Sequence, residues 1–377
     1  MERIISFIVW IALAQGFFLS VLYFLSPKHK SLSNKILSLF LFSLLIEGLN
    51  VFLPFNEIFG YKLSNYFTTP EVKLFFPVLA FHYILKKLGR VAVYKRHLIV
   101  GYTLAFIILA LTPFNITLYL SRGKYIYDWF TPYQYEVLFM SQQVLAFTLS
   151  VASLVVSLIE LRRHKRIANE VHSDISLTQV NWLFRFILIL GFISLLWGME
   201  LLRIALGAIG GDEIVLITWG VVCLFIYYVS YQAFVRPDLF EESDPESDVV
   251  LEANEVSNSL ATNNKESMHS ETIELLENAM SNQKLYLNTD LTIHDLARSL
   301  TISARKISQS INTLNAQNFS EWVNNFRVQE AIQYLENNSE NNLSIEGIGQ
   351  ESGFKSRSAM YSAFKKITGK SPGDFRS

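Results

Sequence analysis

Long apolar runs dominate the first part of the chain, whereas after Arg236 the apolar positions become short and periodic. A helix needs roughly 20 mostly apolar residues to cross about 30 Å of hydrocarbon. Seven runs approach that length, and the third, which contains Lys73 and Pro77, is the weakest. The expected spans are Ile4–Leu25, Ile36–Leu53, Val72–Leu85, Leu98–Phe114, Tyr135–Leu158, Trp182–Ala205 and Ile214–Phe234. The pattern predicts an all-α protein whose residues 1–236 form a polytopic seven-helix transmembrane domain.

Positive charges alternate between the connections of these runs. The first, third and fifth connections are basic, while the intervening ones are poor in Lys and Arg. Their basic residues are Lys28, Lys30, Lys35, Lys86, Lys87, Arg90, Lys95, Arg96, Arg162, Arg163, Lys165 and Arg166. Positively charged loops favour the cytoplasmic side of a membrane. If the third span is real, the N-terminus lies outside and everything after Arg236 lies inside.

The overall composition agrees with a membrane protein, because 51% of the residues are hydrophobic and only 17% are charged. Soluble domains are nearer a quarter charged. Cys223 is the single cysteine, so one chain can build neither a disulfide nor a cysteine-based zinc site. The apolar part contains no HExxH, GxSxG or phosphate-loop motif. We therefore expect no enzyme activity, no metal and no cofactor.

Three of the charged residues within the expected spans are candidates for a site, since a charge costs a few kcal/mol at mid-bilayer and needs a reason there. Glu47 lies in the outer half of the second span, and Glu200 and Arg203 lie three residues apart at the outer end of the sixth. Together they could form an outward-facing ligand pocket near Trp197. The alternative is a structural ion pair, or side chains that reach up to the headgroups.

The segment that follows the last span changes in composition. Residues 237–270 are acidic and rich in Ser and Asn, and they show no sustained periodicity. Such a composition cannot bury enough apolar surface to fold alone. We expect a flexible linker, which either holds the following domain away from an anionic membrane surface or acts as a plain spacer.

From Glu271 onward the apolar positions recur at helical spacing. Thr292 followed by Asp295 is a variant of the capping box and predicts a short helix that ends near Leu300. Ser303 can cap the next helix. Two crossing helices would bury Leu296, Ala297, Leu300, Ile302, Ile307 and Ile311. This pattern indicates a helix-turn-helix.

A long amphipathic helix, Phe319–Asn337, leads to a second unit of the same kind. Its apolar stripe comprises Trp322, Phe326, Val328, Ile332 and Leu335. Ser344 caps another short helix, Gly353 marks the turn, and a further helix begins near Ser356. Met360, Phe364 and Ile367 should face inward. Residues 271–377 are therefore expected to hold two helix-turn-helix units joined by one long helix.

The stretch GFKSRSAMYSAFKKITGKSPGDFR (Gly353–Arg376) resembles the second helix-turn-helix of AraC/XylS-type transcription regulators, including its Gly-x-x-Pro ending. LARSLTISARKISQSIN (Leu296–Asn312) resembles the first. The whole layout is similar, more loosely, to bacterial proteins that place several membrane spans before such a domain. The resemblance implies a DNA-binding domain at residues 271–377, on the cytoplasmic side of a bacterial inner membrane.

The resemblance also implies which side chains face DNA. The two recognition helices would be about Ser303–Leu314 and Ser356–Ile367, and the N-terminal part of such a helix meets base edges. The matching base-facing residues are Arg305, Ser308, Gln309, Arg357, Ser358 and Ser362, with Lys306, Lys355 and Lys365 near phosphate. Arg suits guanine and Gln suits adenine. For each one alone, the alternative is a solvated helix face.

The second unit departs from the family pattern at two positions. Gly347 and Gly349 stand where the family more often has Glu and Ala. A glycine inside a helix costs about 0.5–1 kcal/mol relative to alanine. We therefore expect this unit to be loosely folded until it binds DNA.

Three functions fit these features. In the first, a membrane-embedded transcription regulator senses a signal through its apolar part and binds a promoter. Its partners would be double-stranded DNA, membrane lipid, a small-molecule or peptide signal and a second copy of the chain. In the second, a transporter or membrane enzyme carries a regulatory helical tail, although no repeated halves are visible. In the third, the terminal domain docks onto protein as a scaffold.

Overall fold

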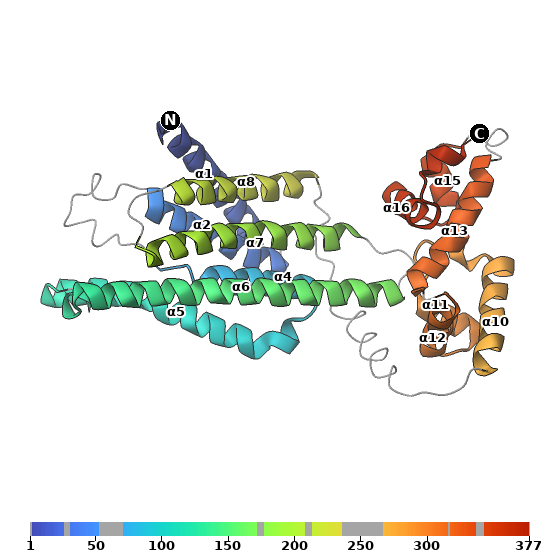
Figure 1. The fold of residues 1–377 in the computed structure, drawn as a ribbon, viewed down its shortest axis with the longest axis horizontal. Helices are drawn as coiled ribbons and strands as arrows, with labels where there is room; N and C mark the ends of the chain where they lie inside the picture. Colours follow the sequence, from blue (N-terminus) through green and yellow to red (C-terminus); the bar gives the residue numbers. More distant parts are fainter. Residues whose placement is uncertain are drawn as a thin grey trace. The chain divides into compact units, whose positions relative to one another are not determined.

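The computed structural model of the chain describes residues 2–25, 31–52, 71–124, 126–171, 177–207, 213–235, 267–315, 317–336 and 343–376. Throughout these ranges every regular element is a helix, which confirms the all-α expectation. The chain folds as two compact units (Figure 1). The apolar unit comprises Met1–Leu161 and Thr178–Pro245, and the C-terminal unit comprises Arg162–Leu177 and Glu246–Ser377.

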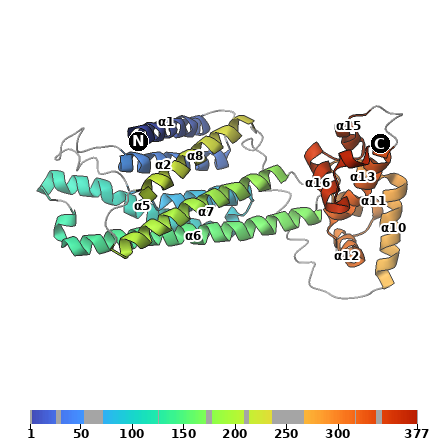
Figure 2. The ribbon, with the colours of Figure 1, turned by 45° about the horizontal axis from the view of Figure 1, so that its top comes forward.

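Each of the seven apolar runs forms a helix of the apolar unit. In both ribbon views these helices lie together in one bundle, which α1 crosses obliquely in Figure 1 (Figures 1 and 2). Their bounds are α1 Glu2–Leu25, α2 Leu32–Phe52, α4 Phe75–Lys87, α5 Val91–Arg122, α6 Pro132–Val171, α7 Leu177–Ala205 and α8 Glu213–Val235, with a short 3-10 helix η2, Ile126–Trp129, before α6. The last ten residues of α6 belong to the C-terminal unit.

Length separates these helices into two groups. Among the described residues, α2, α5, α6, α7 and α8 are long and apolar enough to cross a membrane. The described apolar part of α1, Val9–Leu25, is shorter. Helix α4 has 13 residues and is about 20 Å long at 1.5 Å per residue, short of the roughly 30 Å of hydrocarbon. A crossing by all seven helices therefore stays a prediction.

The C-terminal unit is built from short helices around one longer helix. Their bounds are α10 Ser267–Gln283, η4 Leu285–Leu287, α11 Ile293–Leu300, α12 Ala304–Asn315, α13 Phe319–Glu336, α15 Ile345–Glu351, α16 Arg357–Thr368 and η5 Pro372–Phe375. Helix α10 begins at Ser267, inside the segment expected to be a linker. The rest of that expected linker, residues 237–266, lies outside the described residues.

Helix α13 joins two apolar cores because its two halves bury different side chains. Phe319, Trp322 and Val323 pack with α10, α11 and α12 in one core. Val328 and Leu335 pack with α15 and α16 in the other. Figure 2 shows α11 and α12 toward one end of α13 and α15 toward the other. The long helix therefore carries both helix-turn-helix units.

The buried positions agree with the predicted apolar stripes, apart from one. Leu296, Ile307 and Ile311 are buried in the first core, and Met360 and Phe364 are fully buried in the second. Ile367, which we expected to face inward, is 40% exposed. It lies in the last turn of α16, next to Thr368, where the helix ends.

Candidate nucleic-acid interface

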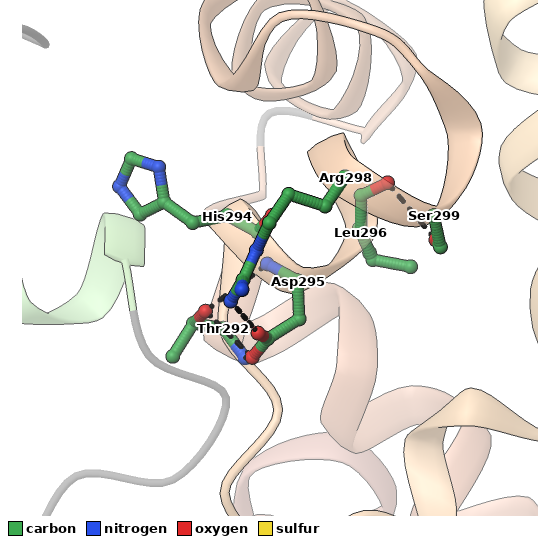
Figure 3. A network of polar contacts seen from close by, with 6 residues as sticks. All are labelled: Thr292, His294, Asp295, Leu296, Arg298 and Ser299. Atoms are coloured by element: carbon green, nitrogen blue, oxygen red, sulfur yellow. Dashed lines mark hydrogen bonds and ion pairs between the residues drawn. The ribbon is translucent and has the colours of Figure 1, made fainter.

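The first helix-turn-helix unit begins with a reciprocal cap (Figure 3). The Asp295 amide donates to Thr292 Oγ1 at 3.2 Å, and the Thr292 amide donates to Asp295 Oδ2 at 2.9 Å. This confirms the predicted capping box. Helix α11 ends at Thr301 in the left-handed conformation, with φ +56°. The Lys306 amide then donates to Ser303 Oγ at 3.3 Å, so Ser303 caps α12, the first predicted recognition helix.

The second unit repeats this construction. Ser344 Oγ accepts from the Gly347 amide at 3.1 Å and begins α15. Ser356 Oγ accepts from the Ala359 amide at 3.2 Å and caps the start of α16, the second predicted recognition helix. Between the two helices, Gly353 turns the chain with φ +85°, a backbone conformation that favours glycine. All three predicted positions therefore have the expected local roles.

A buried arginine of α13 fixes the segment around η4. Arg327 Nε donates to the Tyr286 carbonyl oxygen at 2.8 Å, and its Nη2 donates to the Asn288 carbonyl oxygen at 2.7 Å. Glu330, one turn along α13, accepts from Tyr286 Oη and Lys284 Nζ, each at 2.8 Å. Burial raises the pKa of the Tyr286 phenol, and the bond to the Glu330 carboxylate acts in the same direction. This network ties the entry of the first unit to the long helix.

Two ion pairs hold the second unit against the rest of the domain. Lys355 Nζ lies 2.6 Å from Asp290 Oδ1, which joins the turn before α16 to the loop before α11. The hydrogen bond from Lys355 lowers the pKa of the Asp290 carboxyl. Lys366 of α16 pairs with Glu321 of α13. Both pairs lie at the surface, where an ion pair adds little stability, and they connect the second helix-turn-helix unit to the loop before α11 and to α13.

The predicted DNA-facing side chains of the second unit are open to solvent. These are Lys355, Arg357, Ser358, Ser362 and Lys365. Positions 358, 362 and 365 follow helical spacing and so form one stripe on α16. The Arg357 guanidinium lies over the Tyr361 ring, 5.2 Å from its centroid, and Nη2 donates to Tyr361 Oη at 3.3 Å. Tyr361 therefore orients the arginine with the best chemistry for reading guanine.

The corresponding side chains of the first unit are partly covered. Arg305, Lys306, Ser308 and Gln309 on α12 are all half-buried. Ser308 Oγ donates to Glu170 Oε2 at 3.4 Å. Glu170 lies in the last turn of α6, which is part of the same compact unit as α12. The two recognition helices thus differ in how far their predicted contact residues are exposed.

The charged residues of the apolar unit form bonds that the sequence only partly indicates. Glu200 and Arg203 pair with each other, with Arg203 Nη2 2.6 Å from Glu200 Oε1. Glu47 instead pairs with Lys73 at 3.2 Å, and it also accepts from Asn50 Nδ2 at 3.3 Å. The pairing of Glu200 with Arg203 agrees with the alternative that these charges form a structural ion pair. That these residues share one ligand pocket stays a prediction.

Trp197 lines a pocket of a different kind. The walls come from α2, α4, α6 and α7, and they include Phe40, Phe76, Ser150 and Ser194. Nearly all of this lining is apolar, and Ser150 satisfies its hydroxyl by donating to the Ala146 carbonyl oxygen at 2.9 Å. The lining of this pocket does not include Glu47, Glu200 or Arg203, so the predicted charged site near Trp197 stays a prediction.

Three residues of the interface are absent from the sequence expectations. Tyr361 follows Arg357 by four residues on a helix, so their contact could be found from spacing. Arg327 and Asp290 act on segments that are distant in the chain, and no local pattern indicates such partners. Arg327 also lies on the amphipathic helix, next to its apolar stripe, where a charged residue is expected to be solvated.

Residues 296–377 match a family model described as a helix-turn-helix domain. The match covers less than a quarter of the chain, and it includes α12, α13, α15 and α16 in full. Neither a curated protein nor a solved structure matches the chain. The two capped units, their turns and this match together show that the chain ends in a helix-turn-helix domain of the AraC type, a class of domain that binds DNA.

Proposed function

We propose that the protein is a membrane-embedded, sequence-specific transcription regulator. The observation that carries this proposal is the exposed surface of α16, which presents to solvent the Arg357 guanidinium held over Tyr361, the hydroxyls of Ser358 and Ser362, and Lys365. Phosphate contacts position a protein on DNA, whereas contacts with base edges select the sequence. We assign Arg357, Ser358 and Ser362 to base edges and Lys355 and Lys365 to phosphate.

The first helix-turn-helix unit supplies the other half of the proposed interface with DNA. Arg305, Ser308 and Gln309 would meet base edges, with Lys306 near phosphate. Two recognition helices on one face of a duplex reach major grooves that lie about 34 Å apart. The link between the two helix-turn-helix units, through Arg327 and Gly353, supports binding to two half-sites in phase. DNA selected by this domain should therefore contain two conserved blocks one helical turn apart.

The apolar unit supports the membrane part of the proposal. Five described helices have the length and composition to cross a bilayer. With the basic connections on the cytoplasmic side, the N-terminus lies outside a bacterial inner membrane and the DNA-binding domain lies inside. In this arrangement residues 1–236 receive an external or lipid-borne signal, and residues 271–377 act on a promoter. A ligand changes the DNA-binding state only by its difference in affinity for the two states.

The decisive experiment compares two variants of the full-length protein in lipid nanodiscs. Duplexes are first selected by the wild-type protein from a random-sequence pool. Arg357→Ala should weaken binding to the selected duplex about tenfold or more, with little effect on random DNA. Lys365→Ala should weaken both equally and reduce the salt dependence by about one ion.

Two outcomes would count against the proposal. If Arg357→Ala lowers affinity equally for selected and random DNA, the residue does not read bases. If the wild-type protein shows no salt-dependent affinity for any duplex, the domain is not a DNA-binding module in this protein. The second outcome would favour a tail that regulates a transporter or enzyme, or a scaffold that docks onto protein.

A further inference from the structure

The last turns of α6 are packed against the first recognition helix. Val171, the final residue of α6, is 1% exposed and shares an apolar core with Ile307 and Ile311 of α12. Ala168, one turn earlier, is also buried. Burying an apolar side chain removes it from water and favours the docked arrangement. The end of α6 thus contributes to the core of the DNA-binding domain.

Docking places a carboxylate on the side of α12 that is predicted to face DNA. Glu170 Oε2 accepts from Ser308 Oγ at 3.4 Å, and Asn312 also hydrogen-bonds this carboxylate. Ser308 and Asn312 are four residues apart and so lie on one face of the helix. Asn312 Nδ2 in turn donates to Ser308 Oγ at 3.4 Å. Of the predicted base-facing residues of α12, Ser308 is therefore already bonded to an acidic side chain.

A duplex cannot use this face while the segment is docked. The last turn of α6 lies over Ser308, a predicted base-facing residue, and the Glu170 carboxylate there would repel phosphate. The exposure of the two recognition helices agrees with this, because the predicted contact residues are half-buried on α12 and exposed on α16. DNA binding by the first unit and docking of α6 therefore exclude each other.

We infer that the last turn of α6, centred on Glu170 and Val171, is an intramolecular ligand of the first recognition helix and competes there with DNA. This inference rests on the proposed DNA-binding function. Helix α6 is continuous from Pro132 to Val171, so a displacement of the helix along or around its axis moves Glu170 with it. Release of this turn would free the first half-site, while α16 remains open in both states.

The loss of DNA affinity caused by docking depends on the fraction of protein molecules in which the end of α6 is docked. Apparent affinity falls in proportion to the fraction of protein in the binding-competent state, so a docked population of about 90% weakens binding about tenfold. Val171→Ser removes apolar contact without changing charge, and Glu170→Gln removes charge with little change in shape. Each should raise the affinity of the full-length protein for selected duplexes about five- to tenfold.

The test measures these variants in nanodiscs against duplexes selected by the wild-type protein. Glu136→Gln makes the same chemical change at an exposed position near the start of α6 and should leave the affinity unchanged. Footprinting should show protection that extends into the first half-site for Val171→Ser and Glu170→Gln. Hydrogen exchange of residues 162–171 should rise in Val171→Ser, which would report that the segment has been released.

Three results would overturn the inference. One is faster exchange of residues 162–171 in Val171→Ser with unchanged DNA affinity, because docking would then not compete. Another is a fall in affinity, which would mean that the exposed Arg162, Arg163, Lys165 and Arg166 assist DNA binding from the docked position. The third is an absence of DNA binding in the wild type and in both variants, which would also refute the proposed function. The first two leave that function intact.

Discussion

Gly353 lies directly against the backbone of Tyr286, so that a Cβ on residue 353 would fall 2.4 Å from the Tyr286 carbonyl oxygen. That carbonyl oxygen also accepts the bond from Arg327 Nε. The turn of the second helix-turn-helix unit therefore rests on the segment that the long helix holds in place for the first. A side chain at position 353 would push the second helix-turn-helix unit away from the first. It would also be strained, because residue 353 has a φ of +85°.

We expect Gly353→Ala to lower the free energy of unfolding of the second unit by about 2–3 kcal/mol. Hydrogen exchange of α15 and α16 in the full-length protein measures this change locally. If α15 and α16 of Gly353→Ala exchange as slowly as in the wild type, the close approach of residue 353 to the Tyr286 backbone would be contradicted.

Gly347→Ala is a matched control, because it should stabilise the second helix-turn-helix unit where Gly353→Ala destabilises it. A Cβ at position 347 would meet Ser344 Oγ at 3.5 Å and Leu343 Cδ2 at 3.7 Å, which are ordinary contacts. The amide that Ser344 caps would be kept. We expect this substitution to stabilise α15 by about 0.5–1 kcal/mol, because alanine is the better helix former. Slower exchange in α15 would confirm it, and faster exchange would show that the glycine is needed.

Arg327→Met should destabilise the junction between the units. The substitution leaves the Tyr286 and Asn288 carbonyl oxygens without the guanidinium that now bonds both, at a cost of about 2–3 kcal/mol. Arg327→Lys offers a single ammonium in place of a planar fork and should recover only part of this loss. The exchange rates of η4 and of residues 288–292 measure the effect.

Arg298→Met is the control for this substitution. Its side chain is 78% exposed, and it pairs with Asp295 at the surface, where an ion pair is worth little. A loss in Arg298→Met equal to that in Arg327→Met would show that removal of positive charge, rather than the buried bonds, causes the destabilisation.

These positions show how far the sequence determines the site. Thr292, Ser303, Ser344 and Gly353 act on neighbouring residues, and their caps and turn follow from short-range chemistry that spacing reveals. The partners of Arg327 and Lys355 lie about 40 to 65 residues away, so only the folded chain identifies them. Ser308 is hydrogen-bonded by Glu170, a residue more than 130 positions earlier in the chain. No periodicity could indicate that contact.

The capping box of α11 predicts that the stability of this helix falls at acidic pH. Burial tends to raise the pKa of the Asp295 carboxyl, but the bonds from Thr292 and the charge of Arg298 outweigh it, so the pKa lies below its ordinary value of 3.8. A lowered pKa in the folded state means that the charged form stabilises α11 above the unfolded-state value. This stabilisation is lost as the pH falls through the folded-state value.

Exchange of the α11 amides, corrected for intrinsic rates, should therefore accelerate as the pH falls below about 3.8. Asp295→Asn should lower protection at neutral pH by about 1 kcal/mol, the typical contribution of such a cap, and should flatten the pH dependence. An unchanged pH profile in Asp295→Asn would assign the acid sensitivity to another group.

Tyr361→Phe tests whether the contact with Tyr361 prepares Arg357 for base recognition. The phenylalanine ring can still lie under the guanidinium, but the hydroxyl that accepts from Nη2 is lost. We expect affinity for the selected duplex to fall about two- to fivefold, less than in Arg357→Ala, with random DNA unaffected. Combining the two substitutions should add nothing to the effect of Arg357→Ala, because residues that act through one contact are not additive. A further loss in the double variant would mean that Tyr361 contacts DNA independently, and an unchanged affinity in Tyr361→Phe would mean that the ring alone orients the arginine.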